Sequence, residues 1–302
     1  MLPSDLSLHS TFCVPSCLDV AVLSLDRRAS PEARDSELFT LTLRAPGWKS
    51  WLPGQFVMIR PQSAPHPDVF WARPFSISQM DEEKLRIVFQ VAGRGTRALL
   101  GLERGELVTV WGPLGNGFAV SRSGPTLLLA GGIGIAPFVG YIERHPAPET
   151  LRLEFGHKLH LDCYPFVECL SANCTLAKTE AGKILIEARN HHETCPEDLS
   201  RFVSTMADAI RDTAARNGLV LACGPMPFLK SVKKIASQFK AQCQISLETR
   251  MACGVGACLG CVVKNTAPKV EMATASIPEV FRYVQTCTTG PVFWADQIEF
   301  DE

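Results

Sequence analysis

Residues 126–137 read Thr-Leu-Leu-Leu-Ala-Gly-Gly-Ile-Gly-Ile-Ala-Pro, and this stretch decides the fold of one half of the chain. An apolar run, a glycine turn and a following helical start predict a buried strand that leads directly into a helix. Backbone N–H groups at such a turn can receive the phosphate of a nucleotide. Pro137 stands where a regular G-x-G-x-x-G motif has its third glycine, so the motif alone is an incomplete fingerprint. The candidate nucleotide contacts in this stretch are Gly131, Gly132, Gly134 and Pro137.

The sequence after this stretch continues the same pattern. Strand-like apolar runs alternate with stretches of helical apolar spacing, at 151–155, 183–188, 202–210, 219–223 and 228–239. This alternation predicts βαβ units and a parallel sheet, which we assign to residues 123–245. The run at 219–223 leads into Cys-Gly-Pro-Met-Pro. Because ligands of open α/β sheets bind at the carboxyl ends of strands, the further candidate contacts are Cys223, Gly224 and Pro225.

The sequence before this stretch is built differently. Short β-like runs are separated by turn residues such as Pro46-Gly47 and Pro53-Gly54, and they lie at 18–25, 37–44, 55–60, 85–91 and 106–112. Five or six such strands without a long helical pattern predict a small antiparallel barrel. We assign this barrel to residues 1–122.

Two motifs in the predicted barrel are candidate flavin contacts. The first is Arg73-Pro74-Phe75-Ser76, in which an arginine and a hydroxyl together can hold a pyrophosphate and the edge of a flavin ring. In the second, Val88-Phe89-Gln90 precedes a glycine turn that contains Gly95 and Thr96, where a helix start can receive a phosphate. A surface arginine on an edge strand and an ordinary tight turn explain the same residues, so both alternatives stay open at this point.

The cysteines after residue 250 follow the spacing of a metal site. Cys253, Cys258, Cys261 and Cys287 spell C-x4-C-x2-C…C, the pattern by which plant-type ferredoxins hold a [2Fe–2S] cluster. Three intervening glycines suit a loop that wraps closely around inorganic sulfide. A zinc knuckle or buried free thiols are the alternatives, although zinc sites usually show two tight cysteine pairs. The remaining cysteines, among them Cys13, Cys17, Cys163, Cys169 and Cys174, follow no ligand spacing, so we expect no second metal site.

Composition excludes several classes of protein. The chain has 302 residues, with 30 Lys+Arg against 31 Asp+Glu and 46% hydrophobic residues. This balance predicts a globular chain of two or three domains with neither a nucleic-acid nor a membrane partner. The longest uncharged run, 124–142, contains five Gly and two Pro, which suits a strand, turn and helix better than a membrane span. The first residues show no secretory signal, so we expect a cytoplasmic location with reduced thiols.

The motifs together resemble one family. RPFS, GRGT, GPLGNGF, GGIGIAP, CGPMP and CGVGACLGC occur in the order found in ferredoxin-reductase-like flavoproteins with a C-terminal [2Fe–2S] domain. Within these, the chain is most similar to the electron-transfer subunits of NAD-linked, type B dihydroorotate dehydrogenases, over about residues 17–140, 218–262 and 286–294. It departs from them by a long insertion at 262–286. It also lacks an acidic, glycine-containing segment, in place of which residues 183–198 read KILIEARNHHETCPED.

The resemblance implies a multidomain β plus α/β fold, with a small [2Fe–2S] domain at 246–302. It implies FAD bound by the barrel motifs, NAD by the glycine and CGP motifs, and the cluster by the four cysteines. The chain is expected to have no catalytic residue of its own and to pass electrons from an FMN-containing dihydroorotate dehydrogenase catalytic subunit to NAD⁺, in de novo pyrimidine (UMP) biosynthesis. The expected assembly is a heterotetramer of two of each subunit.

Three alternatives stay open. A flavin subunit of a hydrogenase or of a nicotinamide–ferredoxin transhydrogenase would share nearly every motif. A self-contained oxygenase reductase would use the same cofactors without a stable partner. A regulator without cofactors belongs to a different class.

Overall fold

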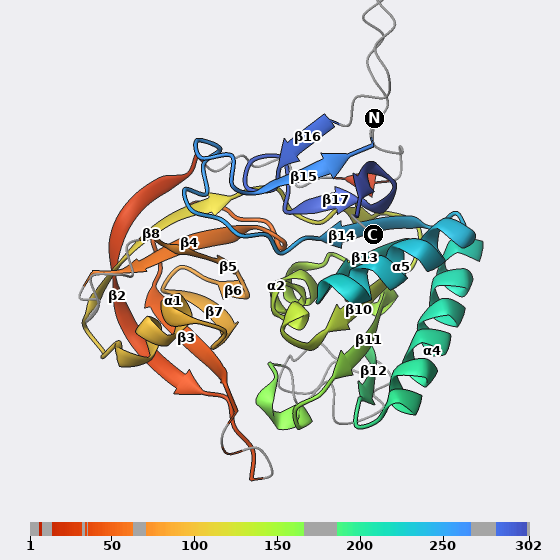
Figure 1. The fold of residues 1–302 in the computed structure, drawn as a ribbon, viewed down its shortest axis with the longest axis horizontal. Coiled ribbons are helices and arrows are strands. Elements are labelled where there is room, and N and C mark those ends of the chain that lie inside the picture. The colour runs from red at the N-terminus through yellow and green to blue at the C-terminus, as the bar shows by residue number, and fades with distance from the viewer. Residues whose placement is uncertain are drawn as a thin grey trace, which may run out of the picture.

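The computed structural model describes residues 6–7, 14–31, 34, 36–62, 71–165, 186–266 and 282–300. Cys13, Cys169 and Cys174, for which we expected no metal role, lie outside these residues. Figure 1 shows the N-terminal strands on the left, the helices and strands of the α/β part on the right, and the strands β15 to β17 across the top.

Seven antiparallel strands form the N-terminal sheet, in the order β5-β4-β8-β2-β3-β7-β6. Their bounds are β2 Ser16–Arg27, β3 Leu38–Arg44, β4 Phe56–Pro61, β5 Arg73–Ser76, β6 Gln79–Met80, β7 Lys84–Gln90 and β8 Leu107–Leu114. The edge strands β5 and β6 are joined by two residues. Ile77 N donates to Gln55 O and Ser78 N donates to Arg86 O, each at 3.0 Å. The sheet therefore curls back toward its own edge, and the predicted antiparallel barrel is confirmed.

A short helical segment follows β7 in the barrel. It consists of α1 (Arg94–Ala98) and the 3-10 turn η1 (Leu99–Gly101). Leu99 and Leu102 pack into the barrel core together with inward residues of the strands such as Val57, Val108 and Val110. The segment therefore covers one end of the barrel interior and carries the GRGT motif with it.

The second sheet has the order β12-β11-β10-β13-β14-β17. Its strands are β10 Thr126–Gly131, β11 Leu151–His157, β12 Glu187–His192, β13 Leu219–Cys223, β14 Gln242–Ser246 and β17 Val292–Trp294. All neighbours from β12 to β14 are parallel, and only β17 runs antiparallel. The predicted parallel sheet is thus confirmed; the strand β14 has no counterpart among the runs identified in the sequence.

Helices cover both faces of this sheet. The 3-10 turn η2 (Gly132–Ile135) leads into α2 (Ala136–Arg144), whereas α4 (Pro196–Ala215) and α5 (Met226–Gln238) pack on the opposite face (Figure 1). Alternate residues of β10 divide between two cores: Leu128 packs with the residues of α2, and Leu127 and Leu129 with those of α4 and α5. Two short 3-10 turns, η3 (Pro148–Thr150) and η4 (Leu161–Cys163), flank β11.

The C-terminal strands are shared between two sheets. β15 (Val262–Asn265), β16 (Arg282–Gln285) and β18 (Ile298–Glu299) form a small antiparallel sheet, whereas β17 extends the α/β sheet. The 3-10 turn η5 (Ala295–Gln297) precedes β18, and a short pair of β1 (Leu6–Ser7) and β9 (Val120–Ser121) lies near the domain junction. Within the described residues, no helix has both the length and the apolar character needed to cross a membrane.

Candidate functional site

The two predicted nucleotide motifs lie side by side at the carboxyl edge of the parallel sheet. β10 and β13 are paired in register, with Ala130 opposite Cys223. A Cβ atom built on Gly134 would overlap the backbone of Cys223 and Gly224, and one on Gly131 would lie 3.0 Å from Pro225 Cδ. Only glycine permits this approach. The structure therefore brings these sequence-predicted residues together; their role as NAD contacts stays a prediction.

The backbone of this edge is shaped to receive a ligand. Gly132 has φ +53°, and a Cβ built on it would meet no atom within 4 Å. Pro137 is buried in the first turn of α2. Burial raises the pKa of the neighbouring Cys223 thiol to about 12, which keeps it neutral. The turn therefore leaves open space at Gly132 beside a neutral thiol, where a pyrophosphate could approach backbone N–H groups.

The two predicted flavin motifs also meet. Gly95 in α1 lies directly against the Arg73 side chain, since a Cβ at Gly95 would overlap its guanidinium. Arg73 Nη1 donates to the carbonyl oxygens of Trp71 at 2.8 Å and Ala72 at 3.1 Å. These hydrogen bonds fix the position of the guanidinium. The hydroxyl of Thr96 accepts from Ala92 N at 2.9 Å and shapes the turn before α1.

The other predicted flavin residues divide between the core and the surface. Phe75 and Phe89 are buried in the barrel core, where their rings lie 5.7 Å apart in an edge-on arrangement. Val88 is buried outside that core cluster, whereas Gln90 is exposed. β7 also contacts η2, so the barrel strand with these residues lies beside the glycine turn of the α/β part. The flavin and nucleotide motifs thus face each other across the domain junction.

The four predicted cluster cysteines come from two chain segments that fold together. β15 begins directly after Cys261 and pairs antiparallel with β16, which ends two residues before Cys287. Thr286 N donates to Cys261 O at 2.9 Å. The arms of the insertion at 262–286 are therefore a hairpin that returns Cys287 to the side of Cys261. The middle of this insertion, 267–281, lies outside the described residues.

The loop that contains the first three cysteines turns sharply around Cys253 Sγ. Gly254 and Gly256 have φ +72° and +86°, and Gln285 Nε2 donates to Gly256 O at 2.5 Å. The Cys253 Sγ accepts backbone N–H groups from Val255 at 3.5 Å and from Cys258 at 3.4 Å. Such donors favour a thiolate, the form that binds iron.

The protonation of the thiols agrees with this geometry. Burial opposes ionisation of Cys253, but the N–H groups of Val255 and Cys258 outweigh it and lower the pKa of this thiol to about 7. Burial and the adjacent Cys261 thiol raise the pKa of Cys287 to about 12. Cys261 and Cys287 are each 2% exposed. An iron ion that displaces the protons would therefore be needed to hold all four as thiolates.

The four cysteine thiols of the loop and of Cys287 interact with one another. Electrostatic and hydrogen-bond contacts link Cys253 with Cys258, and Cys287 with both Cys261 and Cys253. Among the described residues, no three metal-ligating side chains are placed to share one ion. A zinc site needs four ligands around one centre, whereas a [2Fe–2S] cluster takes two thiolates on each iron. The assignment of the individual ligands stays a prediction.

Sequence reasoning missed the residues that attach the cysteine loop to the barrel. Met58 and Trp111, on the outer face of β4 and β8, pack with Cys261 and Cys287. Trp111 Nε1 donates to Cys253 O at 3.0 Å, and Gly254 lies directly over Met58. The signal in the sequence was the alternation of β8, in which buried Val108 and Val110 turn Trp111 outward.

Asn116 provides a second attachment. It lies in the GPLGNGF motif, and its side chain donates to Val292 O at 2.8 Å and accepts from Val292 N at 3.0 Å. It also donates to Thr289 O at 3.1 Å. The segment that follows Cys287 is therefore tied to the barrel by Asn116.

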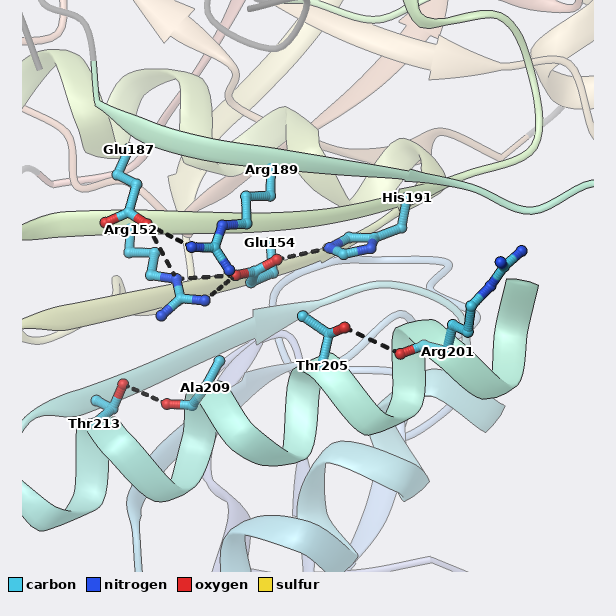
Figure 2. Close-up of polar contacts among 9 residues, drawn as sticks. All are labelled: Arg152, Glu154, Glu187, Arg189, His191, Arg201, Thr205, Ala209 and Thr213. Carbon is cyan, nitrogen blue, oxygen red and sulfur yellow. Dashed lines mark hydrogen bonds and ion pairs between the residues drawn. The ribbon is translucent and has the colours of Figure 1, made fainter. Parts of the chain in front are cut away.

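A cluster of charged side chains lies along β11 and β12 and has no counterpart on β10 and β13. Glu154 is fully buried, and its carboxylate accepts from Arg152 Nε at 2.9 Å and lies 2.6 Å from His191 Nε2 (Figure 2). Arg152 also lies 3.8 Å from Glu187. His191 stacks on Phe202 of α4, with ring centroids 4.6 Å apart. His191 is therefore held on the edge strand β12 by a buried carboxylate.

Comparison with known proteins places these features in a family. Residues 248–299 match the model of the iron-sulfur cluster binding domain of dihydroorotate dehydrogenase B. The electron transfer subunit of dihydroorotate dehydrogenase B (NAD(+)) from Caldanaerobacter subterraneus is 32% identical over 88% of this chain and 94% of its own length. The subunit of the same name from Bacillus velezensis is 31% identical over 82% of this chain and 86% of its own.

Solved structures share the fold. An NADH-dependent reduced ferredoxin-NADP oxidoreductase superposes with a TM-score of 0.65 at 21% identity, over 93% of this chain and 89% of that one. A ferredoxin-NADP⁺ reductase from Plasmodium falciparum gives 0.56 at 12% identity, over 76% of this chain and 96% of its own. These agree with the ferredoxin-reductase-like fold that the motifs predicted. On the strength of the relatives' identity and coverage, the chain belongs to the family of electron transfer subunits of dihydroorotate dehydrogenase B.

Proposed function

We propose that this chain passes electrons from the FMN of a partner dihydroorotate dehydrogenase catalytic subunit, by way of a [2Fe–2S] cluster and FAD, to NAD⁺. The relatives are named as subunits of the NAD-linked enzyme, which places this activity in de novo pyrimidine biosynthesis. A flavin, when bound, exchanges two electrons with a nicotinamide and single electrons with an iron–sulfur cluster. The oxidation of dihydroorotate itself belongs to the partner.

The observation that carries this proposal is the order of the three sites across the molecule. The cysteine loop packs on the outer face of β4 and β8. The RPFS strand β5 pairs with β4 in the same sheet and also contacts β7, and β7 contacts the glycine turn η2. A cluster site, a flavin site and a nucleotide site therefore follow one another without a gap, as electron transfer requires.

Each set of residues has a separate task. Cys253, Cys258, Cys261 and Cys287 would hold the irons. FAD would be held by the two barrel motifs, that is, by Arg73, Pro74, Phe75 and Ser76 and by Val88, Phe89, Gln90, Gly95 and Thr96. Within this site, the guanidinium of Arg73 would bind a phosphate. The NAD site would be lined by Gly131, Gly132, Gly134, Pro137, Cys223, Gly224 and Pro225. Backbone N–H groups there would bind the pyrophosphate.

The partner and the location follow from the same assignment. We assign the FMN-containing catalytic subunit as partner, in a heterotetramer of two of each. We also propose a cytoplasmic location, because the four cysteines assigned to the cluster must stay reduced to bind iron, and thiols persist in a reducing compartment.

The experiment measures orotate formation with the purified FMN subunit and NAD⁺. We expect no turnover of dihydroorotate by this chain alone, coupled turnover after mixing, and dye reduction by NADH in the absence of the partner. The Cys261→Ser variant is expected to abolish the coupled reaction and to retain slow dye reduction, whereas Cys17→Ser, an exposed cysteine of β2, should leave both unchanged. If NADH fails to bleach the flavin while reduced ferredoxin succeeds, the partner is of a different kind and the proposal is wrong.

A further inference from the structure

The indole of Trp111 joins the barrel to the loop that carries the first cysteine. Its Nε1 donates to Cys253 O at 3.0 Å. Val108 and Val110 on the same strand point into the barrel core, so Trp111 is on the outer face, where it is only partly buried. The side chain is therefore placed between the two parts and is not a member of the barrel core.

This hydrogen bond restrains the turn that shapes the sulfur environment. The Cys253 carbonyl belongs to the planar peptide unit that also contains the N–H of Gly254. Gly254, at φ +72°, begins the turn that aims the N–H groups of Val255 and Cys258 at Cys253 Sγ. Because the peptide plane is held on one side by Trp111 and the next residue rests on Met58, the barrel surface sets the direction of these donors.

The same residue is at a fixed distance from the flavin motif. Trp111 is opposite Met58 across β8 and β4, and Met58 is opposite Pro74 across β4 and β5. Neighbouring strands are spaced by about 4.8 Å, so two steps place Trp111 and Pro74 about 10 Å apart. The pairing of β4 with β8 is regular from Met58 to Pro61, beyond the register shift between Phe56 and Met58, and the pairing of β4 with β5 includes Met58, so the three strands hold this separation.

We propose that Trp111 is a positioning residue for electron transfer between the flavin and the iron–sulfur cluster. It holds the ligand loop at a set distance from the RPFS strand and keeps the N–H groups of the loop directed at Cys253 Sγ. Hydrogen bonds to the sulfurs raise the reduction potential of iron–sulfur clusters, because they stabilise the more negative, reduced state. The inference rests on the proposed function, since both cofactors must be bound by this chain.

The test compares Trp111→Phe with Trp48→Phe in the full chain. Trp48 is a matched control, because its Nε1 donates to Ser16 Oγ at 2.8 Å within the barrel and does not contact the loop. Iron and FAD content, the EPR spectrum of the reduced protein and the midpoint potential are measured. For Trp111→Phe we expect full cofactor content and a reduced-to-oxidised ratio at fixed potential that falls about three- to tenfold, the scale of one N–H···S hydrogen bond to Cys253 Sγ that is no longer correctly aimed. For a one-electron couple this equals a midpoint potential lower by about 30–60 mV.

Each outcome decides the inference. An unchanged potential and EPR spectrum in Trp111→Phe, or the same shift in Trp48→Phe, would overturn it. If Trp111→Phe loses its iron but keeps FAD and an unchanged thermal unfolding curve, the residue is needed to assemble the cluster and not to position it, and the inference would be overturned. Loss of FAD together with iron would mean that Trp111 only maintains the barrel, and would overturn it. Wild-type protein without a cluster or flavin would overturn the proposed function as well, before any variant is compared.

Discussion

The cysteine loop at 253–261 and the glycine loop at 131–137 use glycine for opposite purposes. In the cysteine loop, Gly254 and Gly256 take positive φ angles so that neighbouring thiols can converge. In the glycine loop, Gly131 and Gly134 leave room for another backbone to approach. The first loop therefore acts through its side chains, whereas the second acts through its main chain and depends on the absence of side chains.

The two loops also differ in what holds them. The glycine loop is held by β13, the neighbouring strand of its own sheet. The cysteine loop is held by the barrel, through Trp111 and Met58, more than 140 residues away in the chain. The difference predicts that a substitution in one loop abolishes the binding of its own cofactor and leaves the other loop intact. It also predicts that the two loops are sensitive to different kinds of substitution.

The largest effect is expected from a side-chain change in the cysteine loop. Cys258→Ser should remove the cluster completely, because four thiolates are needed for two irons and the serine hydroxyl stays protonated. FAD should be retained, since the inner barrel core and Arg73 do not contact this exposed cysteine. Iron, sulfide and flavin analysis checks this. Loss of both cofactors would show that the loop and the barrel form one cooperative unit.

The predicted flavin site binds phosphate through the side chain of Arg73, whereas the glycine loop would bind it through the main chain. Arg73→Ala removes a charged hydrogen-bond donor worth about 1.5–3 kcal/mol, so FAD should bind about ten- to hundredfold more weakly. Arg60→Ala on the adjacent strand is the control, because this arginine is exposed. The fraction of FAD that each variant retains after dilution measures the difference in FAD affinity between Arg73→Ala and Arg60→Ala. Equal retention by both variants would contradict the assignment of the RPFS motif, and the iron–sulfur spectrum should be unchanged in each.

The glycine loop should tolerate no side chain at Gly134. A methyl group there would overlap the backbone of Cys223 and Gly224, and overpacking of this kind costs about 1–3 kcal/mol. We therefore expect Gly134→Ala to weaken NADH binding by about tenfold or more while cluster and flavin stay in place. Gly101→Ala, at a position with nothing within 4 Å, is the control. Flavin bleaching titrated with NADH gives the answer, and an unchanged titration would remove this loop from the NAD site.

Both loops were identified from the sequence, because glycine and cysteine at short spacing carry their own geometric signal. RPFS and GRGT were also found, and the structure adds that Gly95 lies against Arg73. Trp111 and Met58 could not be assigned, since their role depends on a contact between distant segments that no local pattern records. The same holds for Asn116, whose motif was noted but whose bonds to Val292 appear only in the fold.

Residues 157–200 were the least legible part of the sequence, although a strand-like run was identified at 183–188, and the reason is again physical. A strand rich in charged residues and histidines shows no apolar alternation, yet β12 forms because β11 pairs with it and buries Glu154 at their contact. The role of His191 depends on that carboxylate, on the neighbouring strand, and on Phe202 from the following helix. Sequence spacing alone does not indicate such a combination.

The smallest effect on cofactor chemistry is expected at Glu154, which tests whether the edge at β11 and β12 is structural. Glu154→Gln keeps the shape of the side chain but removes the charge that holds Arg152 and His191 (Figure 2). Because this carboxylate is fully buried, its loss should lower the free energy of unfolding by about 1–3 kcal/mol. Glu187→Gln on the same strand pair is the control: its side chain is 43% exposed, so we expect a change of about 0–1 kcal/mol. Urea unfolding followed by circular dichroism measures both, and NADH titration of the flavin should be unchanged. If Glu154→Gln instead bound NADH more weakly with unchanged stability, the buried Glu154 side chain would contribute to nucleotide binding. Binding through backbone N–H groups alone would then apply only to the part of the NAD site formed by β10 and β13.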